Sequence, residues 1–292
     1  MPTEVPAEVS SILKKYTPTA PDPTAAAIRA CWLTFASNQG IQLIKAEQRQ
    51  QLEAAGTPIP VLQAIGKEIA RIAGKDVPSY LPLARCLWEA YGREGRVIAL
   101  ILFGSMVLVE PDYLVPMLRD LCRSCVSWED TDRLAMDAVE PIVRKHPERW
   151  IDEMAFWLSD ANKWVRRAAI TIIGRLPMKH PIYTPQCLAM AETLLTDSDV
   201  DVRRAVSFAI RMCAKSDPQL ACAFLQQQIS ATNVACVWVL SDVIKSMDRK
   251  ILHQFVSLLP FFQDWKKGMS PSAKERRSLE SAIAVLQHAS AG

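Results

Sequence analysis

The chain has little glycine and no long hydrophobic run. Only 10 of its 292 residues are glycine, and the strict alternation of apolar and polar residues that marks half-buried strands is rare. No apolar segment approaches the roughly 20 residues that a membrane-spanning helix needs. The first two dozen residues also lack the apolar core of a signal peptide. We therefore expect a helical, cytoplasmic protein that has no membrane partner.

Patterns that bind metals are missing as well. The four histidines show no ligand spacing. Cys122-Arg-Ser-Cys125 is a single C-x-x-C pair, without the second pair or the histidine pair that would complete a zinc site. The other cysteines lie mostly in apolar helical windows, where cysteine acts as a small hydrophobic residue. The sequence therefore predicts no metal, no disulfide and no cofactor.

A strong net charge is the third absence. The formal charge is +3, from 34 basic and 31 acidic side chains, whereas many DNA-binding domains are far more basic. If nucleic acid is the partner, the basic residues must be concentrated on one face. Half of the residues are hydrophobic, which is enough for a continuous core.

A motif that occurs twice indicates the fold. Lys163-Trp-Val-Arg-Arg-Ala-Ala-Ile is echoed by Asp201-Val-Arg-Arg-Ala-Val-Ser-Phe-Ala-Ile, and Val165 and Val202 are 37 residues apart. This period is typical of stacked helical hairpins, which build a curved surface. We predict an all-α fold, an α-solenoid of HEAT-like helical hairpin repeats that forms a concave groove.

Helical windows cover most of the chain. Residues 1–24, rich in proline and threonine, are expected to form a loose leader, and residues 25–292 a single HEAT-like repeat domain. Asp160, Ser198 and Asp217 are expected to be N-caps. The predicted helices span 25–37, 40–54, 58–73, 79–91, 94–108, 111–123, 130–145, 148–158, 163–176, 184–196, 200–214, 217–229, 232–246, 248–259 and 272–287.

In each of the two motifs, helical spacing places cations on a side of the predicted helix that does not face the core. Lys163, Arg167 and Thr171 share one side of the first predicted helix, and Arg203 of the second is expected to pair with Asp199. A stripe on the second helix combines three cations with one aromatic: Arg204, Phe208, Arg211 and Lys215. Such a surface suits phosphates and a ring or sugar. The solvated face of a purely structural repeat would have the same spacing, and periodicity alone favours that interpretation.

A tryptophan and a carboxylate lie four residues apart in the preceding repeat. Trp128 and Asp132 fall on one side if their segment is helical. Glu129 and Asp130 are rival acids, and Asp132 is preferred because it shares the side of Trp128. The structural alternatives are that Asp132 complements a helix dipole and that Trp128 packs between repeats.

These motifs together resemble the HEAT-like-repeat DNA glycosylases of the AlkD type, the DNA alkylation repair family. The resemblance runs from about Thr34 to the Lys274-Glu-Arg-Arg segment, and the interval from Asp132 to Arg167 agrees with the family pattern. Its parts are Leu-Trp88…Arg-Glu94…Ala99, Trp128-x-x-x-Asp132, Trp164-x-x-Arg167-Ala-Ala-Ile and Arg204-Ala-Val-x-Phe208-x-x-Arg211.

The resemblance implies a role for each matching residue. It places Trp128 beside the lesion, Asp132 as the catalytic aspartate and Arg167 near the backbone of the damaged nucleotide. The family usually has a second tryptophan where this chain has Phe208, which keeps a π face but loses the indole N–H. The resemblance also implies that the enzyme excises the base without extruding it into a pocket, whereas most enzymes that modify bases extrude them.

The residues themselves also suit the removal of an alkylated purine. Alkylation at N3 or N7 makes a purine a cationic leaving group, so the cleavage needs no general acid on the base. It needs stabilisation of an oxocarbenium-like sugar and a positioned water, both of which Asp132 could supply. Trp128 and Phe208 would cradle the sugar and the cationic nucleotide, and Arg167 and Arg211 would hold phosphates.

We therefore predict a monomeric, monofunctional DNA glycosylase that excises N3- and N7-alkylated purines from double-stranded DNA. Arg204, Lys163 and Lys215 complete the expected DNA-binding set with Phe208 and Arg211. One alternative is a non-catalytic HEAT-repeat protein that binds damaged or branched DNA, which Phe208 keeps open. The other is a protein-interaction scaffold, whose concave face would be apolar or acidic.

Overall fold

The computed structural model describes residues 4–44, 46–74, 76–106, 109, 111–231, 234–268 and 272–290. Within these ranges all regular structure is helical and there is no strand. None of the helices described there is both long enough and apolar enough to span a bilayer. The chain divides into two compact units, residues 1–142 and 143–292. A repeat array makes contacts mainly between neighbouring hairpins and divides readily into such units, so the predicted single domain over 25–292 stays a prediction.

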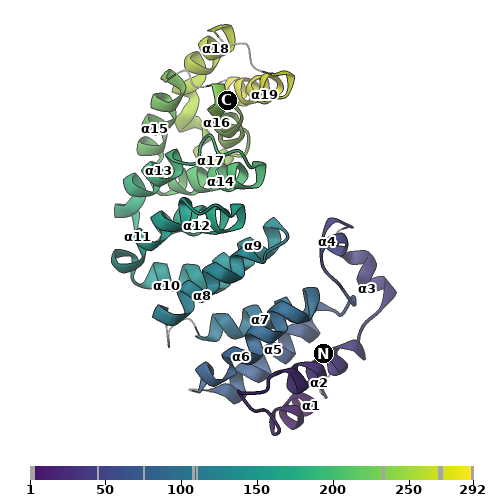
Figure 1. Cartoon of the computed structure of the whole chain (residues 1–292). Helices are drawn as coiled ribbons and strands as arrows, with labels where there is room; N and C mark the ends of the chain where they lie inside the picture. The colour runs from purple at the N-terminus through teal and green to yellow at the C-terminus, as the bar shows by residue number, and fades with distance from the viewer. Residues whose placement is uncertain are drawn as a thin grey trace. The chain divides into compact units, whose positions relative to one another are not determined.

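The first unit is built around α7, which packs against both α5 and α6 (Figure 1). Helix α1 packs on α5, and α2 packs on α6. The helices of this unit are α1 (Val5–Leu13), α2 (Asp22–Leu33), α3 (Asn38–Leu43), α4 (Ala46–Gln51), α5 (Ile59–Ala73), α6 (Leu81–Ala90), α7 (Gly92–Met106), α8 (Pro111–Arg123) and α9 (Trp128–Leu134). Helix α9 continues through a π-helical segment, Ala135–Val139, into α10 (Glu140–Lys145).

Helix α1 and the start of α2 lie in the segment that was expected to be a loose leader, and that expectation is wrong for residues 5–13 and 22–24. Val5, Val9 and Leu13 recur at helical spacing and are buried. The prolines of this segment suggested a loose chain, but Pro6 falls in the first turn of α1, where no helical hydrogen bond is lost.

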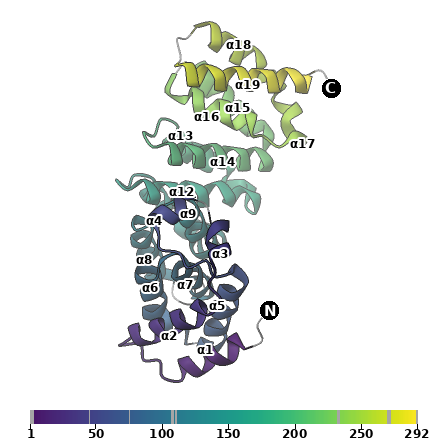
Figure 2. The ribbon, with the colours of Figure 1, turned by 90° about the vertical axis from the view of Figure 1, so that its right-hand side faces the viewer.

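The second unit consists of two layers of helices. Figure 1 shows α11, α13, α15 and α18 in one layer and α12, α14, α16 and α19 in the other. Successive helices of the second layer are in direct contact, and Figure 2 shows α12 beside α14 from another side. The helices are α11 (Pro147–Leu158), α12 (Lys163–Arg175), α13 (Thr184–Glu192), α14 (Val200–Ser216), α15 (Pro218–Ser230), α16 (Val237–Lys245), α17 (Arg249–Leu252), α18 (Leu259–Gly268) and α19 (Ala273–Ser290). This arrangement confirms the predicted all-α fold of stacked HEAT-like hairpins.

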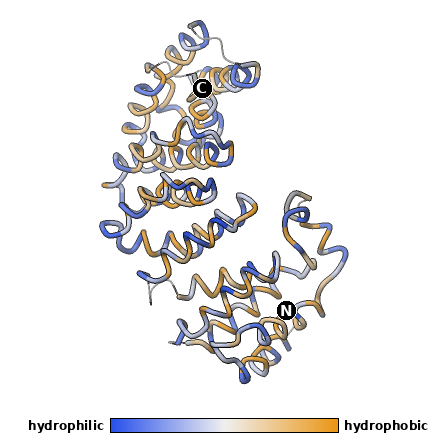
Figure 3. Tube along the Cα trace, viewed as in Figure 1, coloured by the Kyte–Doolittle hydropathy of each residue, from blue (hydrophilic) through white to orange (hydrophobic). Residues whose placement is uncertain are grey.

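Helices α12 and α14, which carry the two motifs 37 residues apart, pack closely on each other. A Cβ added at Gly174 of α12 would lie only 2.5 Å from the Cα of Ala209 on α14. Ala168 and Ala205, which correspond in the two motifs, are both buried. Apolar and polar residues alternate along the helices of both units (Figure 3), so each helix has an apolar side for this packing.

Glu94 is a buried acid within the Trp88…Glu94…Ala99 segment, where Trp88 and Ala99 are buried as well. Its Oε1 accepts hydrogen bonds from the amides of Gly56 (3.0 Å) and Thr57 (3.4 Å), and Gly56 has a φ of 75°. A Cβ at Gly56 would lie 2.4 Å from the amide nitrogen of Ile41. The carboxylate therefore ties the turn before α5 to α7.

Several predicted boundaries need correction. The helix expected over 40–54 is interrupted at Ile44, whose backbone is extended, and α18 was not predicted. Of the three predicted N-caps, Asp217 is confirmed by its hydrogen bond to the amide of Leu220. Those at Asp160 and Ser198 are wrong. Asn162 and Asp199 cap α12 and α14 instead, each accepting from the amide two residues later.

Candidate functional site

Helix α9 places Trp128 and Asp132 on the same side, as predicted, because it begins at Trp128 and the two residues are one turn apart. Its N-cap is Ser127, whose hydroxyl accepts a hydrogen bond from the amide of Asp130 (3.2 Å). The Thr131 hydroxyl donates to the Ser127 carbonyl (2.9 Å). Cap and hydroxyl together fix the turn that carries the pair.

The surroundings of this pair differ from those of a core tryptophan. Trp128 is 40% exposed, whereas Trp32, Trp88 and Trp157 are at most 2% exposed. Asp132 is partly buried. An exposed tryptophan beside a partly buried carboxylate is an arrangement suited to ligand contact rather than to packing between repeats.

The rival acid Asp130 already has a structural partner. Its Oδ2 accepts a hydrogen bond of 2.8 Å from Nη1 of Arg96 on α7, and the Asp130 side chain is 16% exposed. Burial raises the pKa of Asp130, and the guanidinium of Arg96 opposes this increase. Glu129, the other rival, is partly buried. Asp130 is therefore fixed in an ion pair, which supports the preference for Asp132.

Two features near Asp132 were not predicted. The π-helical segment Ala135–Val139 begins three residues after Asp132, and such segments are rare and frequently lie at functional sites. The second is Arg96, 8% exposed. A single arginine directly before the apolar run Val97–Leu102 was the only sequence signal for a buried cation.

The predicted stripe on α14, formed by Arg204, Phe208, Arg211 and Lys215, is present and not fully buried at any position. We call it the α14 stripe. Each cation in it lies near a carboxylate. Arg204 pairs with Asp201 at 3.4 Å, and Lys215 pairs with Asp248 at 3.5 Å. The stripe is therefore a row of ion pairs with Phe208 between them.

Arg211 is the most strongly held cation of the stripe. Its Nη1 donates to Ser207 Oγ (2.6 Å), and that hydroxyl donates to Oδ2 of Asp242 on α16 (2.7 Å). The guanidinium lies 3.6 Å from the same carboxylate. Burial lowers the pKa of Arg211, while Asp242 raises it. The network orients the guanidinium in advance of any ligand.

The predicted side of α12 is largely buried. Lys163 is half-buried, lies 3.0 Å from Asp199 and 3.4 Å from Asp201, and sits 4.3 Å above the Trp164 ring. Arg167 is 6% exposed and Thr171 is 1% exposed. The guanidinium of Arg167 donates to the backbone carbonyl of Asp201. Of the three side chains on this side, only Lys163 is substantially open to solvent.

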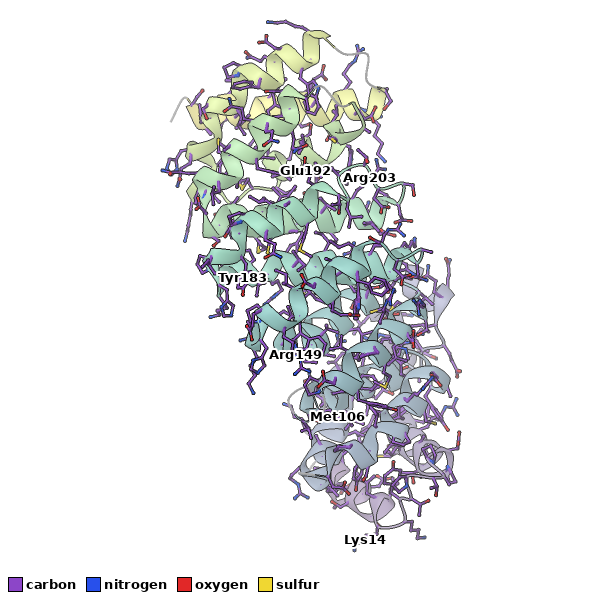
Figure 4. The ribbon with its side chains drawn as sticks, turned by 60° about the vertical axis from the view of Figure 1, so that its left-hand side comes forward. Lys14, Met106, Arg149, Tyr183, Glu192 and Arg203 are labelled. Atoms are coloured by element: carbon purple, nitrogen blue, oxygen red, sulfur yellow. The ribbon has the colours of Figure 1, made fainter. Side chains whose placement is uncertain are left out.

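The predicted pairing of Arg203 with Asp199 is wrong. Asp199 faces Lys163 of α12, and the Arg203 guanidinium lies 5.5 Å from the centre of the Trp238 ring on α16. Figure 4 shows Arg203 near the start of α14. Its geometric equivalent in the first motif, Arg166, instead forms a two-point ion pair with Asp197 (2.7 and 3.1 Å). Asp197 has no acidic counterpart one period later, at position 234, which explains the difference.

The candidate residues are divided between the units. Trp128 and Asp132 belong to the first, and Lys163, Arg167 and the α14 stripe belong to the second. In the part of the chain that the structure describes, no group of three or more histidines, cysteines or acids could hold a metal ion. Cys122 and Cys125 are both buried thiols.

Comparison with known proteins gives a consistent result. A family model described as DNA alkylation repair enzyme matches residues 35–237. Among solved structures, smu.31 from Streptococcus mutans UA159 is 20% identical, with a TM-score of 0.50 over 65% of this chain and 99% of that one. AlkD2 from Streptococcus mutans is 18% identical, with a TM-score of 0.52 over 78% of this chain and 100% of that one. These two similarities concern the fold. No curated protein sequence matched the chain.

Proposed function

The chain belongs to the family of DNA alkylation repair enzymes, as the sequence resemblance predicted, and we propose that it is a monofunctional glycosylase that removes N3- and N7-alkylated purines from duplex DNA. The observation that carries the proposal is the pair on α9, an exposed Trp128 with a partly buried Asp132 one turn later. The neighbouring acid Asp130 forms an ion pair with Arg96, and Asp132 is the acid that shares the side of the tryptophan on α9.

The proposed reaction breaks the bond between C1′ of the sugar and the alkylated purine. The electron pair of that bond goes to the base, which loses its positive charge and leaves as a neutral purine. Positive charge develops on the sugar as an oxocarbenium-like species, and the carboxylate of Asp132 stabilises it electrostatically. A water molecule then forms the new C1′–O bond and gives one proton to Asp132. The product is an abasic site.

Trp128 would act through the face of its ring. A cation over an indole is stabilised by about 0.5–2 kcal/mol, depending on how far it is desolvated. Both the alkylated base and the sugar in the transition state are cationic, so this contact would contribute to recognition and to rate.

The second unit would supply the phosphate contacts. In the proposal, Arg211 and the other cations of the α14 stripe bind the DNA backbone, and Phe208 contributes a π face. Lys163 adds a half-buried cation that lies near Asp199 and Asp201, while Arg167 offers a guanidinium that the backbone carbonyl of Asp201 already orients. Each cation of the α14 stripe is paired with a carboxylate, from Asp201, Asp242 or Asp248. Phosphates must therefore replace these carboxylates when DNA binds. Binding should depend steeply on the salt concentration.

A non-catalytic binder of damaged DNA is the second candidate, and the observation that favours it is Phe208 where the family usually has tryptophan. A protein-interaction scaffold fits less well, since the α14 stripe consists of cations paired with carboxylates around Phe208 and is neither apolar nor purely acidic. Release of free N7-methylguanine from duplex DNA separates the two remaining candidates, because a binding protein would retain DNA without releasing base.

A further inference from the structure

We propose that Arg96 is a positioning residue for both Asp132 and Trp128. Through the start of α9 it holds the turn from which these two side chains project. The inference rests on the proposed function, because it assigns Arg96 a role in the reaction attributed to Asp132.

Arg96 joins three chain segments of the first unit. From α7 its Nη1 donates to Oδ2 of Asp130 at the start of α9 (2.8 Å), and its Nη2 donates to the carbonyl of Ser124 at the end of α8 (3.0 Å). The guanidinium also lies 4.7 Å from the centre of the Trp88 ring on α6. Trp88 in turn donates from Nε1 to Ser124 Oγ (2.8 Å). We call Arg96, Trp88, Ser124 and Asp130 the Arg96 network.

The network acts on the segment that the proposed chemistry needs. Asp130 lies midway between Trp128 and Asp132, two residues from each. Its amide is held by the Ser127 cap, and its carboxylate is held by Arg96. The first turn of α9 is thus fixed from the backbone side and from the side-chain side.

Helix α9 needs such an anchor because its α-helical geometry changes soon after Asp132. It has 7 residues and continues directly into the π-helical segment. The helical run that continues into α10 does not fix the register of α9, because π-helical geometry does not continue the α-helical hydrogen-bond pattern. The placement of Asp132 therefore depends on what holds the beginning of α9.

Arginine suits this position better than any other cation. Its planar guanidinium donates to two acceptors at fixed angles while one face stacks on an indole, which a lysine ammonium cannot do. Arg96→Lys keeps the charge opposite Asp130 but cannot maintain the bond to Ser124, the bond to Asp130 and the stacking together. Arg96→Lys therefore keeps the neutralisation of the Asp130 charge but loses the contacts that orient α9.

The experiment compares the wild type with Arg96→Lys in the full-length protein, with Arg85→Lys as the matched control. Arg85 lies on α6 and forms an exposed pair with Glu89, outside the Arg96 network. The measurements are single-turnover release of N7-methylguanine, affinity for the same duplex, and amide hydrogen exchange in peptides that cover 124–134 and, as a reference, 200–216.

The network predicts a specific combination of results. In Arg96→Lys, base release slows by about 10- to 100-fold, as expected when reacting groups are misplaced by about an ångström. DNA affinity stays within about threefold of wild type, because the phosphate contacts lie on the second unit. Exchange in 124–134 accelerates by about tenfold or more, the effect of losing a buried hydrogen bond to a charged group, while exchange in 200–216 does not change.

A double variant tests whether Arg96 only neutralises Asp130. Arg96→Met with Asp130→Asn removes both charges, so it avoids the unpaired buried carboxylate that would destabilise Arg96→Met alone. If Arg96 only neutralises the charge of Asp130, the double variant should release base at the wild-type rate. The positioning role predicts that it folds but remains at least about tenfold slow.

The outcomes distinguish this inference from the proposed function. An active wild type with a wild-type rate in Arg96→Lys, or in the double variant, overturns the positioning role alone. Unchanged exchange in 124–134 in Arg96→Lys also overturns it. A wild type that releases no base, although it binds the duplex, overturns the proposed function and with it this inference.

Discussion

Asp132 follows Trp128 by one turn of α9, and the two share a side of that helix, with the tryptophan 40% exposed and the aspartate partly buried. Such a pair offers a π face and a negative charge next to each other. Both attract a cation, and the sugar in the transition state of purine release is cationic.

Replacing Trp128 should affect chemistry far more than folding. In Trp128→Ala, single-turnover base release should fall by about 3- to 30-fold, which corresponds to the loss of a cation–π contact of roughly 0.5–2 kcal/mol. Trp157→Ala is the control, because Trp157 is fully buried and its loss should cost about 3–5 kcal/mol of stability. Thermal unfolding and base release of both variants check this. A large drop in the melting temperature of Trp128→Ala would indicate a packing role instead.

Phe208→Trp restores the aromatic side chain usual in the family. We expect it to release base at least as fast as the wild type, because tryptophan is the stronger partner for a cation. Phe208→Ala should be slower than either. Rates on N3-methyladenine and N7-methylguanine duplexes make the comparison. Equal rates for all three proteins would remove Phe208 from the site.

In an ion pair of the α14 stripe, replacing the cation and replacing the carboxylate should change DNA affinity in opposite directions. Lys215→Ala should weaken DNA binding and reduce the slope of log affinity against log salt by about 1. Asp248→Asn should tighten binding, since it removes the carboxylate that competes with phosphate for Lys215. Salt titrations of binding to an undamaged duplex measure both effects.

Lys267→Ala serves as the control for these variants. Lys267 forms a similar ion pair with Asp264, at 3.1 Å, but both side chains are highly exposed and lie on α18. Its substitution should leave the salt slope unchanged. If Lys215→Ala behaves in the same way as Lys267→Ala, the α14 stripe is not a phosphate surface.

The attachment of α1 should depend on pH. Hydrogen bonds from Arg71 lower the pKa of Glu68 to about 2; burial acts against this shift, and the hydroxyl of Ser10 on α1 reinforces it. A depressed pKa means that the ionised carboxylate stabilises the fold above its unfolded pKa of about 4.3. This contribution is lost as the pH falls towards about 2.

Melting temperatures of the wild type and Glu68→Gln test this linkage. The wild type should be more stable at pH 7, and the difference should shrink as the pH falls from about 5 to about 2. A difference that is independent of pH would mean that the charge of Glu68 contributes nothing.

Local spacing was sufficient to predict the helical fold and which candidate residues share a side of α9 or of α14. The 37-residue period identified the hairpins, and i to i+4 spacing placed Asp132 with Trp128 on α9 and Phe208 with Arg204 on α14. These are properties of one helix or of two adjacent repeats, which the sequence displays directly.

The partners of those residues could not be predicted, because they come from distant positions. Arg96 is 34 residues from Asp130, and Ser207 is 35 residues from Asp242. The carboxylates of the α14 stripe were therefore missed, and an apparently cationic surface proved to be a row of ion pairs. Helix α1 was missed for a different reason, since its proline content outweighed the spacing of Val5, Val9 and Leu13.

The most direct test of the account is release of N7-methylguanine and N3-methyladenine from duplex DNA by the wild type, Asp132→Asn and Glu129→Gln. The account predicts release by the wild type and Glu129→Gln. In Asp132→Asn the rate should fall by about 10²- to 10³-fold or more, the effect of losing a charge-stabilising group, with DNA affinity nearly unchanged. Release by Asp132→Asn at the wild-type rate would contradict the proposed mechanism.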